Sequence, residues 1–117
     1  MRKLKIGNYN VKIRVPDRMN PGQMIEGEHP FHVKDSILNL MFNPELRLSG
    51  AEVVKQNILA VKIESCSEDE IMLEDEEYLR IKKAFDTFKG FNRNDVEMLE
   101  RIDTAEVVEV EEVDKKT

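Results

Sequence analysis

The sequence predicts an α+β fold in which an N-terminal β-hairpin packs on about four α-helices. Residues 2–16 alternate charged and apolar side chains, the period of a strand with one buried face. Residues 49–52 read Ser-Gly-Ala-Glu, the capping-box pattern that begins a helix. Residues 78–88 place large apolar side chains at the spacing of one helix face, namely Tyr78, Ile81, Phe85 and Phe88.

The first predicted element is the hairpin over residues 2–16. Its two halves are separated by Gly7-Asn8-Tyr9-Asn10, residue types that tolerate turns. Pro16 ends the second half because proline has no amide hydrogen for a ladder. We expect one face to be apolar and Tyr9 to lie in the turn, available for stacking. The other face is expected to gather the cations Lys3, Lys5, Lys12 and Arg14.

Residues 17–33 are predicted to be a long loop, because they hold prolines and glycines and show no periodicity of their own. Loops of this length in small domains tend to be functional or mobile. Met24 and Ile25 are the apolar residues expected to hold this loop to the core. The loop is also the place where a contact with a partner is most expected.

The helices are predicted from caps and apolar spacing. Asp35 or Ser36 caps the first, Ser49 caps the second and Asp75 caps the third. The first helix runs through Phe42 and is closed by Asn43-Pro44, since the residue before a proline avoids helical backbone. The four helical segments are 35–42, 49–64, 75–89 and a last one from residue 94 onward.

Residues 70–74 are predicted to be a third strand, placed beside the hairpin in an antiparallel sheet. Ile71 and Leu73 would join the core, whereas Glu70 and Glu74 would face outward. Like charges opposite one another on a sheet repel, so the basic face of the hairpin needs carboxylates near it. We expect this strand or the acidic tail to supply them, in the same molecule or in a second copy.

The chain is predicted to form one domain, residues 1–104, followed by an acidic tail, residues 105–117. A length of 117 residues suits a single small core. The tail is rich in valine and glutamate, and the sequence leaves open whether it is an edge strand or disordered. Val108 and Val110 are its candidate contact residues, because such a segment can add to a partner as a strand.

Charge is distributed unevenly along an acidic chain of net charge −6. Residues 1–18 carry six basic side chains, and residues 64–77 carry eight acidic ones and no basic one. No apolar stretch approaches the roughly 20 residues needed to cross a bilayer, and we expect no membrane contact. The N-terminus lacks the apolar region of a secretory signal. The single cysteine, Cys66, fits a cytoplasmic location.

Motifs for catalysis and cofactor binding are not found in the sequence. It contains no phosphate-binding loop, no dinucleotide fingerprint, no nucleophile elbow and no zinc-protease helix. His29 and His32 lie close in sequence, but on a Pro/Gly segment without further defined ligands. Cys66 lies beside an acidic run that disfavours a thiolate. The sequence therefore predicts no enzyme, no cofactor and no metal.

The function that these observations favour is a non-catalytic protein-interaction, assembly or regulatory module. A protein partner is expected, and a homodimer through the tail or the hairpin edges is a corollary. Weak nucleic-acid binding by the basic hairpin face remains an alternative. A second alternative is an acidic surface that mimics nucleic acid. The candidate contact residues are Lys3, Lys5, Tyr9, Lys12, Arg14, Met24, Ile25, Val108 and Val110.

The chain resembles small accessory proteins of tailed phages and prophages. The resemblance lies in its short length, its acidity, its scarcity of motifs and the order of a hairpin followed by helices. It concerns the general character of the whole chain, and no residue role is carried over from it. It implies an accessory role in assembly or regulation.

Overall fold

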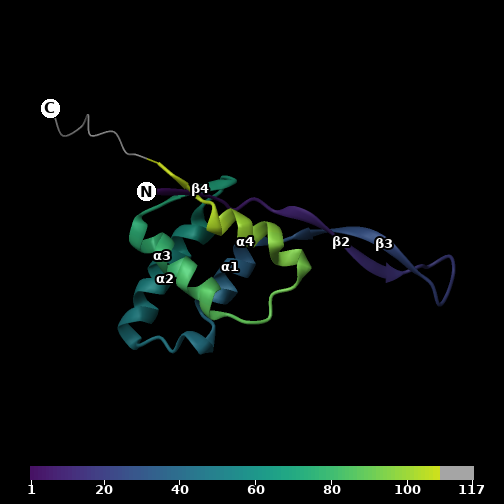
Figure 1. Cartoon of the computed structure of the whole chain (residues 1–117), viewed down its shortest axis with the longest axis horizontal. Helices are drawn as coiled ribbons and strands as arrows, with labels where there is room; N and C mark the ends of the chain where they lie inside the picture. Colours follow the sequence, from purple (N-terminus) through teal and green to yellow (C-terminus); the bar gives the residue numbers. More distant parts are fainter. Residues whose placement is uncertain (109–117) are drawn as a thin grey trace.

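The computed structural model describes residues 1–108, with a helical body and a two-stranded arm that projects from it (Figure 1). This arrangement confirms the α+β class, the presence of a β-hairpin and four α-helices. In chain order the elements are β1 (Arg2–Lys5), β2 (Tyr9–Pro16), β3 (Met24–Phe31), α1 (Val33–Met41), η1 (Pro44–Leu46), α2 (Gly50–Ser65), β4 (Glu70–Leu73), α3 (Asp75–Thr87), η2 (Arg93–Asp95), α4 (Val96–Asp103) and β5 (Glu106–Val107).

A three-stranded antiparallel sheet has β1 at its centre, between β4 and β5. Lys3 lies opposite Met72 on one side and opposite Glu106 on the other. The predicted third strand is confirmed as β4, and its inward side chains Ile71 and Leu73 are 6% and 0% exposed. The start of the acidic tail therefore supplies an edge strand of this sheet.

The hairpin pairs strands other than those predicted. β1 and β2 follow each other in sequence but lie in separate sheets, and β2 pairs with β3 over its whole length, from Tyr9–Phe31 to Pro16–Met24. The predicted loop at 17–33 is wrong for this reason, since residues 24–31 form β3. Gly27 and Pro30 are tolerated there because β3 is an edge strand, which can accommodate residues that a central strand rejects.

The predicted turn at residues 7–10 is replaced by extended chain that is tied to the body. The amides of Ile6 and Gly7 both donate to the carbonyl oxygen of Asp69, at 2.7 and 3.1 Å. The side-chain oxygen of Asn8 accepts from the amide of Val33 at 3.1 Å. These bonds hold the chain in line after β1, so β2 runs away from the sheet instead of folding back on it.

The core is one cluster, formed by the inward side chains of β1 and β4 and by all four α-helices. Leu4 and Ile6 enter it from the N-terminal segment, each 1% exposed. Gln56 is the buried polar side chain, and its amide nitrogen donates to the carbonyl oxygen of Met41 at 3.0 Å. Burial of a polar amide is tolerated here because it is hydrogen-bonded.

The helix boundaries follow local capping signals with small shifts. Ser49 caps α2 as predicted, its hydroxyl accepting from the amide of Glu52. His32 precedes α1, so the predicted cap at residue 35 or 36 is wrong by about one turn. Glu74, rather than Asp75, caps α3, in a box with Glu77. None of the helices within residues 1–108 combines the length and the apolar character that crossing a membrane demands.

The two faces of α3 offer a test of this packing. Ile81 is 0% exposed and Leu79, on the same helix, is 62% exposed. Ile81→Ala is expected to lower the free energy of unfolding by about 2–5 kcal/mol, because it leaves a cavity. Leu79→Ala is the matched control and should cost less than about 1 kcal/mol. Urea unfolding followed by circular dichroism measures both, and equal losses would contradict the assigned helix face.

Candidate functional site

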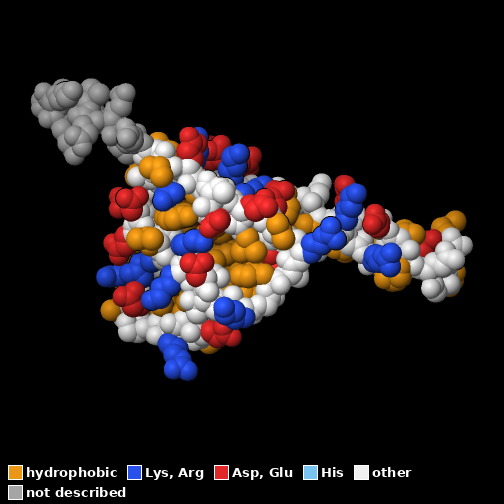
Figure 2. All heavy atoms as spheres, viewed as in Figure 1, with side chains coloured by type: hydrophobic (Ala, Val, Ile, Leu, Met, Phe, Trp, Pro, Cys, Tyr) orange, Lys and Arg blue, Asp and Glu red, His pale blue; other side chains and the backbone are white. Residues whose placement is uncertain are grey.

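The arm, residues 9–31, is the most exposed feature of the described structure. Figure 2 shows charged side chains along it and apolar side chains near its tip. Along β2, half-buried and exposed residues alternate without a break. The arm therefore has two different faces, one apolar and one charged.

The apolar face of the arm is formed by Val11, Ile13 and Val15 of β2 together with Ile25 of β3. None of these four side chains belongs to the core cluster or to the residues packed against it. Ile13 lies directly opposite Gly27, which has no side chain to cover it. Ile25 is 47% exposed, and Met24 beside it is 53% exposed. The face is thus apolar and only one layer thick.

The charged face of the arm sets cations against carboxylates. Lys12 lies opposite Glu28, and Arg14 lies opposite Glu26. Cross-strand pairs of opposite charge favour this register modestly. The predicted single basic face is wrong, because Lys3 and Lys5 lie on β1 in the other sheet.

The root of the arm is fixed by Tyr9, which sequence analysis placed in a turn. Its ring stacks on Phe31 with centroids 4.8 Å apart, and its hydroxyl donates to the carbonyl oxygen of Asn94 at 2.8 Å. Burial raises the pKa of the Tyr9 phenol above its ordinary value. The Tyr9 ring is therefore part of the joint between arm and body, and the exposed stacking role expected of it is wrong.

Arg101 of α4 completes this joint. Its guanidinium lies over the Tyr9 ring, 5.0 Å from the centroid, and donates to the carbonyl oxygen of Gly7 at 2.6 Å. Its other terminal nitrogen pairs with Glu97 at 2.6 Å. The helix α4 thereby holds the chain just before β2 and the first ring of β2 at the same time.

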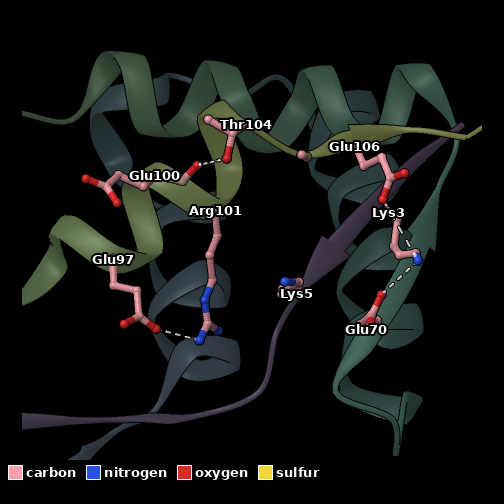
Figure 3. Close-up of a pocket in the computed structure, with 9 residues that line it drawn as sticks. Lys3, Lys5, Glu70, Glu97, Glu100, Arg101, Thr104 and Glu106 are labelled. Carbon is pink, nitrogen blue, oxygen red and sulfur yellow. Dashed lines mark hydrogen bonds and ion pairs between the residues drawn. The ribbon is translucent and has the colours of Figure 1, made fainter.

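A groove of about 510 Å³ lies between β1 and α4 and contains Lys3 and Lys5 (Figure 3). Lys3 pairs with Glu70 at 3.4 Å and with Glu106 at 4.0 Å. The expectation that the third strand and the tail supply carboxylates is thus confirmed for Lys3. Exposed pairs of this kind are each worth about 0–1 kcal/mol, so they select register more than they add stability.

The remaining predicted contact residues are spread over the molecule. Met24 and Ile25 lie at the far end of β3, next to the tip of the arm. Val108 follows β5, and its amide donates to the carbonyl oxygen of Met1 at 2.8 Å. Val110 lies outside the described residues. The structure therefore brings together two groups, Lys3 with Lys5 in the groove and the β2–β3 residues on the arm.

The two histidines of the predicted loop lie in different parts of the structure. His29 belongs to the arm, opposite Val11. His32 precedes α1, and its Nδ1 lies 3.3 Å from the side-chain nitrogen of Asn8. Within residues 1–108, no group of three His, Cys, Asp or Glu side chains is placed to hold a metal ion.

Sequence analysis missed the residues that fasten the arm. Arg101 has a local signal only, since Glu97 lies four residues before it on the same helix. Its contact with Gly7 joins residues 94 positions apart, and no local pattern encodes such a contact. Asn94 and Phe31 were missed for the same reason, because their partner Tyr9 is distant in sequence.

A second exposed apolar surface lies on α2, where Val54, Ile58 and Val61 are 60%, 64% and 52% exposed. The opposite face of this helix is anchored in the core by Leu59 and Ile63. This helix therefore keeps its place whether or not its outer stripe is covered. Among the described residues, no core side chain packs beneath the apolar face of the arm, which makes the arm the stronger candidate for a contact surface.

Comparisons of this chain with protein-family models, with curated proteins and with solved structures gave no match. A functional proposal consequently rests on the geometry of the arm and its joint.

Removing the Arg101 side chain tests the joint. Arg101→Ala loses the bond to Gly7 and the contact with the Tyr9 ring, so the amides of residues 9–13 should exchange about tenfold faster with solvent. Arg93→Ala, an exposed arginine near the same joint, is the control and should leave these rates unchanged. Hydrogen exchange measured by NMR would contradict the assignment if the two variants behaved alike.

Alkaline pH provides a second test. Because burial raises the pKa of Tyr9, the neutral phenol is favoured in the folded state. Its contribution to stability should be complete below the unfolded-state pKa of about 10 and be lost as pH rises through the higher folded-state pKa. NMR of ¹³C-labelled tyrosine should give a Tyr9 midpoint above that of the unfolded chain. Tyr9→Phe removes the titration, and a midpoint at or below the unfolded value would refute this reading.

Proposed function

We propose that this chain is a non-catalytic protein-interaction module, acting in assembly or regulation, and that the arm is its contact surface. The observation that carries the proposal is the apolar face of the arm, which lies outside the core cluster. Its members are Val11, Ile13, Val15 and Ile25.

The energetics of a two-stranded arm support this proposal. A lone hairpin is marginally stable in water, because little apolar surface is buried between two strands. Full burial of a valine or isoleucine side chain contributes about 1.5–3 kcal/mol, and these side chains are already partly buried. Covering four of them should therefore contribute about 3–6 kcal/mol, before the costs of association are subtracted. That gain offsets only part of the cost of association, so backbone hydrogen bonds to the partner must contribute as well.

Strand addition is the binding mode that best fits the arm. Within residues 1–108, β2 and β3 form a sheet of only two strands, so each has one edge without a neighbouring strand. An added strand gains backbone hydrogen bonds along such an edge and places alternate side chains on the apolar face.

Nucleic-acid binding is less well supported. Affinity for phosphates grows with the number of cations that can act together. Lys12 and Arg14 face Glu28 and Glu26 across the arm, and Lys3 is paired with Glu70. Mimicry of nucleic acid by the acidic segment remains a prediction. A single cysteine, Cys66, agrees with a cytoplasmic location, which we include in the proposal. The resemblance to accessory proteins of phages agrees with an accessory role, which we include as well.

Site-specific photo-crosslinking in the native host tests the arm. A photoreactive residue at position 13 should form covalent adducts with one protein or a few, a second copy of the chain included, because the apolar face is covered in the complex. The same residue at position 47, exposed on the body, is the control and should give none of these adducts. Absence of adducts at position 13, or the same adducts at both positions, would refute the proposal.

A further inference from the structure

We infer that the occupant of the arm is a second copy of this chain, whose residues 108–111 add as a strand to the open edge of β2. The inference rests on the proposed function, because it names the partner of the same arm. It is carried by the charge pattern of the arm, by the sequence after β5 and by the direction in which β5 ends.

The edge of β2 presents a specific pattern. Val11, Ile13 and Val15 lie on one face, whereas Lys12 and Arg14 lie on the other. A strand that adds there places its own alternate side chains beside each of these sets. The complementary sequence is one in which apolar residues alternate with carboxylates.

The chain carries such a sequence directly after β5. It reads Val108-Glu109-Val110-Glu111, so that the valines can extend the apolar face while the glutamates meet Lys12 and Arg14. The β3 edge is a poorer receptor for it, because Glu26 and Glu28 would lie beside the glutamates.

Charge also disfavours the simplest competing assembly. Joining two β2 edges from two copies would bring lysine and arginine side chains together, and cations on an edge strand discourage pairing with its own kind. An acidic strand added at the same edge would place carboxylates beside these cations, which is favourable. The cations of β2 therefore disfavour pairing with a second β2 edge and favour pairing with an acidic strand.

The arm of the same molecule is out of reach for this segment. β5 runs antiparallel to β1, and the amide of Val108 donates to the carbonyl oxygen of Met1, so the chain leaves the body beside the start of β1. The arm projects from the opposite side (Figure 1). The chain from residue 1 to Lys12 spans roughly 36 Å when extended, whereas residues 109–111 reach only about 11 Å beyond Val108. A second copy must therefore receive the segment.

Two copies can satisfy both contacts at once. The receiving edge lies on the arm, and Val108, at which the donated segment begins, lies on the opposite side of the body, so an antiparallel arrangement brings each segment to the arm of the other copy. Such an arrangement has two-fold symmetry and closes as a dimer.

The experiment is charge reversal in the full chain, with association followed by sedimentation velocity over a range of concentrations. Glu109→Lys with Glu111→Lys should weaken association at least tenfold. Glu45→Lys with Glu64→Lys changes the net charge equally at exposed positions of the body, and it should leave association unchanged. Adding Lys12→Glu and Arg14→Glu to the tail variant should restore association, with circular dichroism confirming the fold.

The outcomes separate this inference from the proposed function. Tail-dependent association, together with a crosslink from position 13 to a second copy, supports the inference. A full chain that stays monomeric at millimolar concentration, or association that ignores the tail substitutions, overturns it. If position 13 then crosslinks to a different protein, the arm keeps its proposed function with another partner. If position 13 gives no adduct, both proposals fail.

Discussion

The carbonyl oxygen of Asp69 accepts hydrogen bonds from two successive amides, those of Ile6 and Gly7. This contact comes just before β4 and continues the pairing of β1 with β4 beyond the end of the strand. Because the chain stays extended here, it does not fold back after β1. β2 must then find a partner elsewhere, and β3 is that partner. The arm is thus a consequence of how the N-terminal segment is tied to the body.

The arm combines a firm root with an open outer part. At the root, Tyr9 stacks on Phe31 and is held by Asn94 and Arg101, so four segments of the chain meet at one ring. Farther out, the two strands pair only with each other within residues 1–108, and their apolar face is one layer thick there. An element of this kind keeps its direction while its outer surface remains available. That combination suits a contact that forms on meeting a partner, because less orientational freedom is lost on binding.

Opposite charges are matched across strands in both sheets. Lys3 lies between Glu70 and Glu106 in the body, and Lys12 faces Glu28 in the arm. Exposed pairs contribute little to stability, yet they favour neighbouring strands of opposite charge over neighbours of like charge. Charge therefore acts mainly as a selector of neighbours in this molecule. The proposed dimer extends the same selection from strands of one chain to strands of two chains.

The sequence by itself determined the features that depend on near neighbours. The capping residue of α2, the apolar stripe of α3 and the alternation that places Ile71 and Leu73 inward can all be read from a few adjacent positions. Only the tertiary structure decided which strands pair. Gly27 and Pro30 obscured β3 because they disfavour central strands, whereas an edge position tolerates them. Strand pairing and the joint at Arg101 depend on contacts between residues far apart in the chain, and periodicity carries no information about those distances.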